Sequence, residues 1–264
     1  MALDHLKHLR DDSARFVAVL RDTPADARVP TCPDWHADDL LWHLATVQWF
    51  WGVVVRDAVA DPESLPQPDR PPDRSALFSF FDEAASLLET ALAETDPHER
   101  RWTWAAHDQT AGFIRRRQAH EALIHRIDAE LTAGVDHAPI DPDLATDGVD
   151  EVLRIMYGGV PPWSRHQLDP GATLSIQSPD RELAWFVTFG TFSGTSPGGH
   201  SYQGAGYLEV ADAGPDRPAA ASMVARSADL DCWLWGRPTI GTIQRSGDPA
   251  VHARLDEIIA DGID

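Results

Sequence analysis

Lysine and cysteine are both nearly absent from this 264-residue chain. Lys7 is the single lysine, so chemistry that needs a lysine Schiff base, including a lysine-anchored pyridoxal cofactor, has almost no candidate residue. The two cysteines, Cys32 and Cys232, cannot build a disulfide framework or a thiolate zinc cage. This cysteine usage predicts a protein of a reducing compartment.

Basic surface and long apolar runs are also lacking. The 42 acidic residues against 22 basic ones give a formal net charge of −20, which argues against a surface that follows phosphates or an anionic membrane. The first residues show no basic start followed by an apolar run, and no stretch approaches the ~18 apolar residues of a spanning helix. We therefore expect a cytoplasmic protein that binds neither nucleic acid nor membrane. The expected oligomeric state, which these patterns do not determine, is a monomer or a weak homodimer.

The hydrophobic pattern divides the chain near residue 140. Before that point, apolar residues recur with the period of a helix in four segments, at about 3–21, 37–59, 75–94 and 113–134. Gly134 is the expected C-terminal cap of the last segment. These segments predict an antiparallel four-helix bundle over residues 1–140.

The remaining residues, 141–264, mix helical and strand-like patterns and predict a smaller α+β domain. The expected segments, in order, are a helix near 144–156, strands at 172–178, 182–190 and 206–212, and helices at 227–238 and 249–262. The predicted fold class is therefore α+β with two domains.

The stretch from His120 to His125, HEALIH, is one residue longer than the His-Glu-x-x-His motif of zinc proteases. Five residues rotate a helical side chain by roughly 140°, so the two histidines leave the helix on different faces and cannot bind one ion. Glu121 and His125 are four residues apart and share a face, with Asp128 one turn further along. The pair of Glu121 and His125 is therefore the candidate chelator, and the protease interpretation fails.

A third ligand has to come from another helix, because two ligands rarely suffice for a functional site. His43 is the candidate, since it lies in the apolar segment DLLWHLATVQWFW. Two histidines and one carboxylate are a ligand set of catalytic zinc, and they also suit other divalent ions. The alternative is a hydrogen-bonded core histidine beside a chance Glu–His spacing. A di-metal carboxylate site is disfavoured, because that design repeats a Glu-x-x-His pair on two helices and this chain has no second copy.

Five segments, taken in order, carry a resemblance to a known family. They are VPTCPDW (29–35), DLLWHL (39–44), RRRQAHEALIHRIDAE (115–130), DLDCWLWGRP (229–238) and SGDPAVHARL (246–255). Together they resemble the mycothiol-dependent maleylpyruvate isomerase family, a branch of the DinB-like metal-binding bundles, over nearly the whole chain.

This resemblance implies a metal site. His43, Glu121 and His125 would ligate a divalent metal, usually zinc, in the core of the bundle, and the domain of residues 141–264 would close over it. The resemblance also implies that Arg237 lies near the substrate. One departure is His36, which stands where relatives commonly have threonine and weakens the expected cap of the next helix.

The implied activity is that of a metal-dependent enzyme. It would activate mycothiol, a thiol cosubstrate, as a thiolate for S-transfer to, or cis-trans isomerisation of, an electrophilic small molecule. The alternative is a non-catalytic metal- or ligand-binding stress-response protein with the same bundle.

Four other features have expected roles, and two of them keep two interpretations. Cys32 is expected to be a small buried residue rather than a reactive thiol, and Cys232 to belong to the core. The run 115–117 of arginines either receives an anionic substrate or forms a solvated face. Asp128 either orients His125 or makes an ordinary salt bridge.

Overall fold

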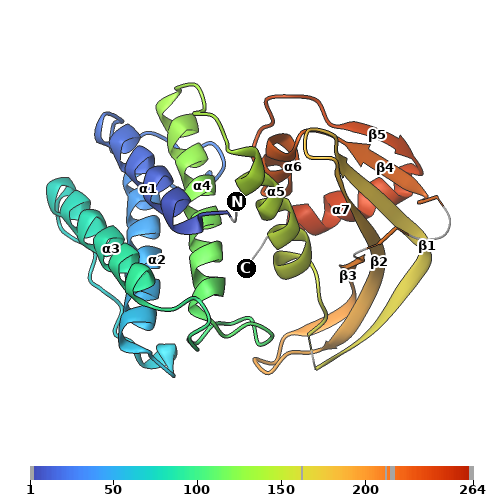
Figure 1. The fold of residues 1–264 in the computed structure, drawn as a ribbon, viewed down its shortest axis with the longest axis horizontal. Coiled ribbons are helices and arrows are strands. Elements are labelled where there is room, and N and C mark those ends of the chain that lie inside the picture. Colours follow the sequence, from blue (N-terminus) through green and yellow to red (C-terminus); the bar gives the residue numbers. More distant parts are fainter. Residues whose placement is uncertain (1–2, 162, 212, 215–217, 262–264) are drawn as a thin grey trace. The chain divides into compact units, whose positions relative to one another are not determined.

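The computed structural model describes residues 3–161, 163–211, 213–214 and 218–261. The chain divides into two compact parts, a bundle unit of residues 1–139 and a sheet unit of residues 140–264. The bundle unit is helical and the sheet unit combines helices with a mixed sheet (Figure 1). The predicted fold class is therefore confirmed.

The described part of the bundle unit contains four α-helices and one short 3-10 turn. Helix α1 packs mainly against α4, while α2 packs against α3 and also against α4 (Figure 1). The pairing of α2 with α4 is the one that later positions the candidate ligands. The elements are α1 (His5–Arg21), α2 (Ala37–Asp57), η1 (Pro62–Ser64), α3 (Arg74–Glu94) and α4 (Ala111–Ala133).

Local polar groups fix where these helices begin and end. The side chains of Asp73 and Thr110 accept the backbone N–H three residues on, at the starts of α3 and α4. At the start of α2, the carboxylate of Asp39 accepts the backbone N–H of His36 at 3.0 Å, so the helix keeps a cap with His36 at this position. Gly134 has a φ of 65° and caps α4, as predicted.

Helix α2 is apolar on more than one face because neighbouring helices cover it. Leu40, Leu41 and Leu44 are fully buried, in a core to which α1 contributes Phe16 and α3 contributes Phe81. The two phenylalanine rings lie 5.3 Å apart between centroids. Among the described residues, every helix is either too short or too polar to cross a lipid bilayer.

A buried ion network joins α1, α4 and the segment that follows α4. The fully buried carboxylate of Glu130 accepts hydrogen bonds from Arg15 and Arg126, each at 2.9 Å, and from the backbone N–H of Ala138 at 3.2 Å. Arg126 is also buried and pairs with Asp12 at 2.8 Å. Charges buried in this way are stable only because each has partners of the opposite sign.

The described residues of the sheet unit form one five-stranded sheet in the order β3-β2-β1-β4-β5. All neighbouring pairs are antiparallel except β1 and β4, which are parallel. The elements are α5 (Pro142–Glu151), a π-helical turn η2 (Val152–Met156), β1 (Ser164–Ser178), β2 (Leu183–Thr195), β3 (Ser201–Ala211), β4 (Ala221–Val224), α6 (Ser227–Leu234), β5 (Gln244–Gly247) and α7 (Pro249–Asp261).

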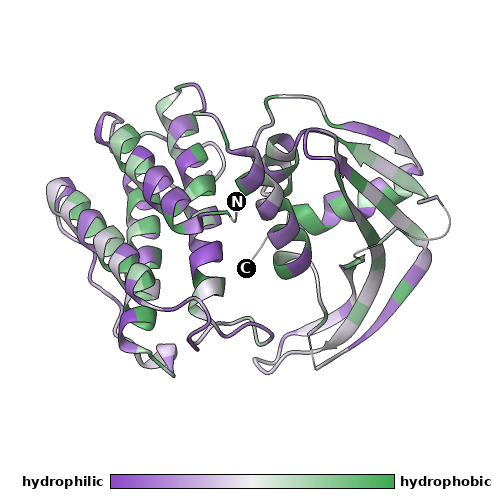
Figure 2. Ribbon diagram, viewed as in Figure 1, coloured by the Kyte–Doolittle hydropathy of each residue, from purple (hydrophilic) through white to green (hydrophobic). Residues whose placement is uncertain are grey.

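One face of this sheet carries the core of the unit. Along β2, Trp185, Val187 and Phe189 are buried and the residues between them are half-buried, which is the two-residue period of a strand with one covered face. Figure 2 shows hydrophobic and hydrophilic residues interspersed along the long strands. Helix α7 packs against β1, β3 and β4, with Leu255 fully buried.

The sheet unit departs from the predicted segments in several ways. The three expected strands are longer than predicted, and β4 and β5 were not predicted. The α-helix expected at 144–156 ends at Glu151 and continues as a π-helical turn. The expected ends of two segments, Asp212 and Gly262, lie outside the described residues.

We predict that Glu130→Ala strongly destabilises the bundle. The substitution leaves the buried Arg126 with less compensation, which costs about 3 kcal/mol in the free energy of unfolding. Urea denaturation followed by tryptophan fluorescence measures this loss. Glu89→Ala, which breaks the exposed pair with Arg10 on the bundle surface, is the control and leaves the midpoint close to wild type. Equal midpoints for the two variants would contradict the structural role of Glu130.

Candidate metal site

Three side chains predicted as ligands lie together inside the bundle unit. His43 comes from the middle of α2, and Glu121 and His125 come from successive turns of α4. One potential ligand atom from each lies within 4.8 Å of the others. The histidine rings face each other at 4.8 Å between centroids and 72° between planes. The pairing of α2 with α4 therefore unites residues that are 78 positions or more apart in the sequence.

Two of the separations between the donor atoms match those around a tetrahedral ion. Oε1 of Glu121 lies 3.1 Å from Nε2 of His125 and 3.4 Å from Nε2 of His43. Zinc bonds of 2.0–2.1 Å at tetrahedral angles place neighbouring ligand atoms about 3.3 Å apart. The spacing and the two-nitrogen, one-oxygen donor set therefore fit a divalent metal, which would sit between these three atoms.

The second carboxylate oxygen of Glu121 has a different partner. The guanidinium of Arg117 donates to Oε2 at 3.1 Å, one helical turn before Glu121. The side chain of Arg117 is almost completely buried. Because Oε2 is held by Arg117, only Oε1 faces the two imidazoles, which favours ligation through a single oxygen.

Asp128 orients the second histidine. Its fully buried carboxylate accepts a hydrogen bond from Nδ1–H of His125 at 2.9 Å. This arrangement directs Nε2 of His125 toward Glu121, and a carboxylate behind a ligating imidazole is a recurrent support of metal sites. Of the two interpretations that the sequence allowed for Asp128, the geometry favours the orienting one.

The charges of this cluster shift two pKa values in the metal-free protein. Burial alone lowers the pKa of His125, but hydrogen bonds to Asp128 and Glu121 outweigh it and raise the pKa to about 9. Burial raises the pKa of Glu121, whereas the hydrogen bonds from His125 and His43 and the nearby Arg117 charge hold it well below its usual range. Glu121 is therefore ionised at neutral pH, and His125 carries a proton that a bound metal would have to displace.

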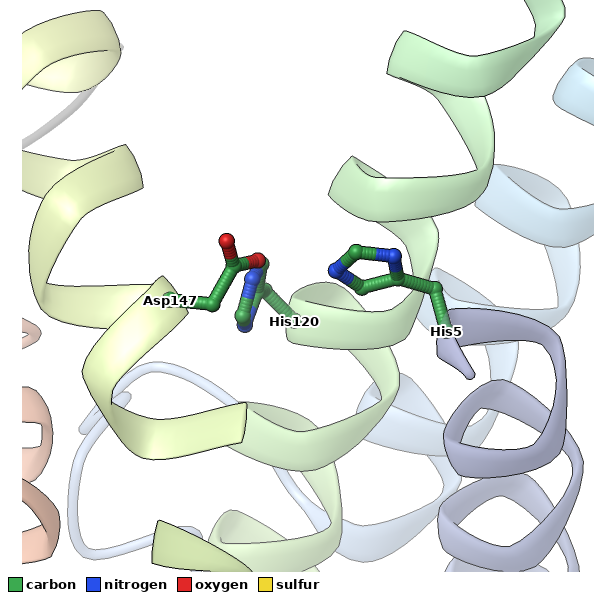
Figure 3. A group of neighbouring side chains, drawn as sticks. All are labelled: His5, His120 and Asp147. Atoms are coloured by element: carbon green, nitrogen blue, oxygen red, sulfur yellow. The ribbon is translucent and has the colours of Figure 1, made fainter. Parts of the chain in front are cut away.

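His120 projects from another face of α4. Its ring meets that of His5, at the start of α1, with centroids 6.1 Å apart and planes at 72° (Figure 3). His125, in contrast, meets His43 of α2. The two histidines of HEALIH thus serve different helix contacts, as the helical rotation predicts. Asp147, also labelled in Figure 3, belongs to α5 of the sheet unit.

Each of the two units matches a known protein domain. Residues 6–130 match the mycothiol maleylpyruvate isomerase N-terminal domain, and residues 143–254 match the MDMPI C-terminal domain, where MDMPI abbreviates the same isomerase. The chain belongs to the mycothiol-dependent maleylpyruvate isomerase family. The matches leave only short segments at the ends and between the units uncovered.

Two solved structures have the same fold as this member of the isomerase family. They are the mycothiol-dependent maleylpyruvate isomerase, at 14% sequence identity, and a variant of it with one histidine replaced by alanine, at 15%. In both cases the TM-score is 0.60 and the likeness covers 92% of each chain. At these identities the likeness concerns the fold. No curated protein matches the sequence.

Arg237 lies in the sheet unit, just after α6. Gly236, with a φ of 71°, turns the chain in a conformation that favours glycine, and the backbone N–H of Arg237 then donates to the carbonyl of Cys232 at 2.7 Å. The half-buried guanidinium donates to the carbonyl of Trp235 at 2.5 Å. Burial raises the pKa of neighbouring Tyr157 to about 12, although the charge of Arg237 opposes the shift. This turn therefore fixes the backbone position from which the Arg237 side chain extends.

The two cysteines and the arginine run 115–117 were the other candidates from the sequence. Cys232 is buried, as expected, whereas Cys32 is half-buried. The arginine run is not a solvated face at either end, because Arg117 is buried and Arg115 donates to carbonyls at the end of α3, those of Leu92 and Thr95. Arg115 therefore binds the C-terminal end of α3.

Three contacts around the ligands were not predicted. Arg117 donates to Glu121, Thr31 donates to Asp128, and the ring of Trp35 lies against that of His43. The four-residue spacing of Arg117 and Glu121 was a usable signal, because such pairs share a helix face. The other two contacts join distant segments, so spacing gave no signal for them.

We predict that the purified protein binds one equivalent of a divalent metal. Glu121→Ala and His125→Ala each remove one of three ligands and lose most of this metal after dialysis, as measured by elemental analysis. His107→Gln, at an exposed histidine of the same unit that lies outside every candidate ligand group of the described residues, is the control and keeps the full equivalent. Retention of a full equivalent by both ligand variants would exclude the proposed site.

We also predict that metal binding strengthens as pH rises. His125 is protonated below its pKa of about 9, and metal binding requires the neutral imidazole, so uptake releases a proton. The apparent dissociation constant should fall by close to tenfold from pH 7 to pH 8. Titration against a chromophoric chelator at each pH measures this, and a constant affinity over that interval would contradict the charge state assigned to His125.

Proposed function

We propose that this protein is a metal-dependent enzyme that activates mycothiol as a thiolate and applies it to an electrophilic small molecule. The reaction is cis-trans isomerisation, as in maleylpyruvate isomerase, or S-transfer to the same kind of electrophile. The observation that carries this proposal is the position of Oε1 of Glu121 within 3.4 Å of both histidine Nε2 atoms, in a chain of the isomerase family.

The ligand set supports catalysis more than a structural role. The cluster contains three potential ligands among the described residues, and structural zinc sites have four protein ligands, whereas catalytic sites have three and an open position. A bound divalent metal would take a thiol to its thiolate at neutral pH. His43, Glu121 and His125 would hold the metal, with Asp128 orienting His125.

The proposed isomerisation balances without an oxidant or reductant. The thiolate sulfur forms a bond to one carbon of a double bond conjugated with a carbonyl, and the electron pair moves to the carbonyl oxygen. Rotation about the new single bond follows, and return of the electron pair expels the thiolate and restores the double bond in the other geometry. In S-transfer, a proton quenches the adduct and the sulfur stays attached.

Arg237 is proposed to bind the carboxylate or the developing oxyanion of the substrate. A guanidinium offers paired N–H donors that match a carboxylate, and such a donor stabilises the negative charge that forms during addition. The family resemblance motivates this assignment. The turn at Gly236 supports it, because the turn fixes the backbone from which the Arg237 side chain extends. One guanidinium N–H donates to the Trp235 carbonyl, which holds one edge of the group in place.

We predict that metal-loaded wild type consumes mycothiol with an electrophile, or isomerises maleylpyruvate in its presence. Arg237→Met should lower kcat/KM by about 10²-fold, because one charge-stabilising donor is lost. Arg245→Met is the control, since Arg245 pairs with Asp256 at the surface of the same unit, and it should retain wild-type activity within about twofold. Absorbance of the substrate and thiol titration follow the reaction.

Three outcomes separate the possibilities. Loss of activity in Arg237→Met with unchanged metal content supports the assigned role. Wild-type activity in that variant shows that Arg237 has no role in the mechanism, but it leaves the proposal that the protein is an enzyme intact. Full metal content with no thiol consumption and no isomerisation across the panel of electrophiles contradicts the enzyme and favours a stress-response binding protein.

A further inference from the structure

The segment that contains VPTCPDW forms a closed loop before α2. Its ends are joined by the hydrogen bond from Ala37 N–H to the Ala27 carbonyl at 2.9 Å and by one from Val29 N–H to the Trp35 carbonyl at 3.1 Å. Inside it, the N–H of Trp35 donates to the carbonyl of Cys32 at 2.8 Å. Val29 is fully buried in the bundle core. We call residues 27–37 the 27–37 loop. These hydrogen bonds anchor the loop at both ends.

This loop reaches the hydrogen-bond partner of one candidate ligand. The hydroxyl of Thr31 donates to Oδ1 of Asp128 at 2.6 Å, and Oδ2 of the same carboxylate accepts Nδ1–H of His125 at 2.9 Å. Thr31 and Asp128 are 97 positions apart in the sequence. A carboxylate held at both oxygens cannot rotate freely, so the contact with Thr31 fixes the direction of the bond to His125.

The same loop contacts the other histidine. The indole of Trp35 lies against the imidazole of His43, with centroids 4.8 Å apart and planes tilted by 44°. Trp35 is half-buried and packs on the bundle core. An aromatic neighbour at this distance restricts the rotation of the imidazole about its χ angles.

We propose that the 27–37 loop is the positioning element of the metal site, with Thr31 acting on His125 through Asp128 and Trp35 acting on His43. One anchored loop thereby sets the orientation of both imidazoles relative to Oε1 of Glu121. This inference rests on the proposed metal site and deepens it, because it identifies which residues outside the ligand set determine metal affinity and geometry.

Substitution of the Thr31 hydroxyl tests the first arm. Thr31→Val keeps the shape and removes the donor, and the metal affinity should fall by about tenfold, within the range known for outer partners of ligands. Thr31→Ser restores the hydroxyl and should recover affinity to within about twofold of wild type. Thr132→Val is the matched control, since Thr132 donates to the backbone carbonyl of Asp128 at 2.7 Å and not to its carboxylate.

Loss of the indole tests the second arm. Trp35→Leu should lower metal affinity and change the visible absorption spectrum of the cobalt-substituted protein, because the His43 ring moves. Trp42→Leu is the matched control, since Trp42 is a half-buried indole on α2 whose ring neighbour is Phe80, at 5.3 Å. Unfolding midpoints of the metal-free variants show whether each pair has lost similar stability.

The outcomes distinguish this inference from the proposed site itself. Lower affinity and altered cobalt spectra in Thr31→Val and Trp35→Leu, with wild-type behaviour in Thr31→Ser and both controls, support the positioning role. Wild-type affinity and spectra in Thr31→Val and Trp35→Leu overturn it and leave the ligand set intact. Equal losses in the test and control variants show a merely structural role and also overturn it. A wild-type protein that binds no metal rejects both the site and the loop's role.

Discussion

The meeting of two imidazoles at one carboxylate oxygen, Oε1 of Glu121, is the interaction on which the candidate site of the bundle unit depends. It requires α2 to lie beside α4 at one level, so that His43 faces His125 at a ring separation of 4.8 Å. It also places charged groups out of water, which is costly unless each has a partner. Arg117 on Glu121 and Asp128 on His125 supply those partners.

Helix α4 shows how the bundle accommodates this polarity. Polar side chains are buried along most of its length, from Arg117 through His120 and His125 to Glu130, although the helix lies within a hydrophobic bundle. These groups are paired with one another or with neighbouring segments, as in the network that joins Glu130 to Arg15 and Ala138. The polar interior of α4 therefore combines a candidate reaction site at one level with a structural ion network at another.

Helical period and spacing predicted much of this arrangement. The four bundle helices, the cap at Gly134 and the shared face of Glu121 and His125 follow from the 3.6-residue repeat, and an apolar setting singled out His43. What the period could not predict are contacts across long sequence distances. Thr31 reaches Asp128 and Trp35 reaches His43 through the tertiary fold, without any regular spacing.

The sheet unit was harder to predict for a physical reason. The first part of β1 is mostly exposed and contains Asp169 and Pro170, so it lacks the alternation that marks a half-buried strand, and its register shifts between Leu168 and Thr173. Strand β5 is exposed throughout and β4 has only four residues. The π-helical turn that follows Glu151 continues a helical pattern with different hydrogen bonds, which periodicity cannot distinguish.

X-ray absorption spectroscopy at the metal edge tests the central claim most directly, because it reports the atoms that surround the ion. For the zinc-loaded protein, the account predicts nitrogen and oxygen neighbours at about 2.0–2.2 Å and no sulfur, and one sulfur neighbour at about 2.3 Å after addition of mycothiol. Sulfur in the resting protein, or a coordination shell that mycothiol leaves unchanged, would contradict a three-ligand site that is open to a thiol.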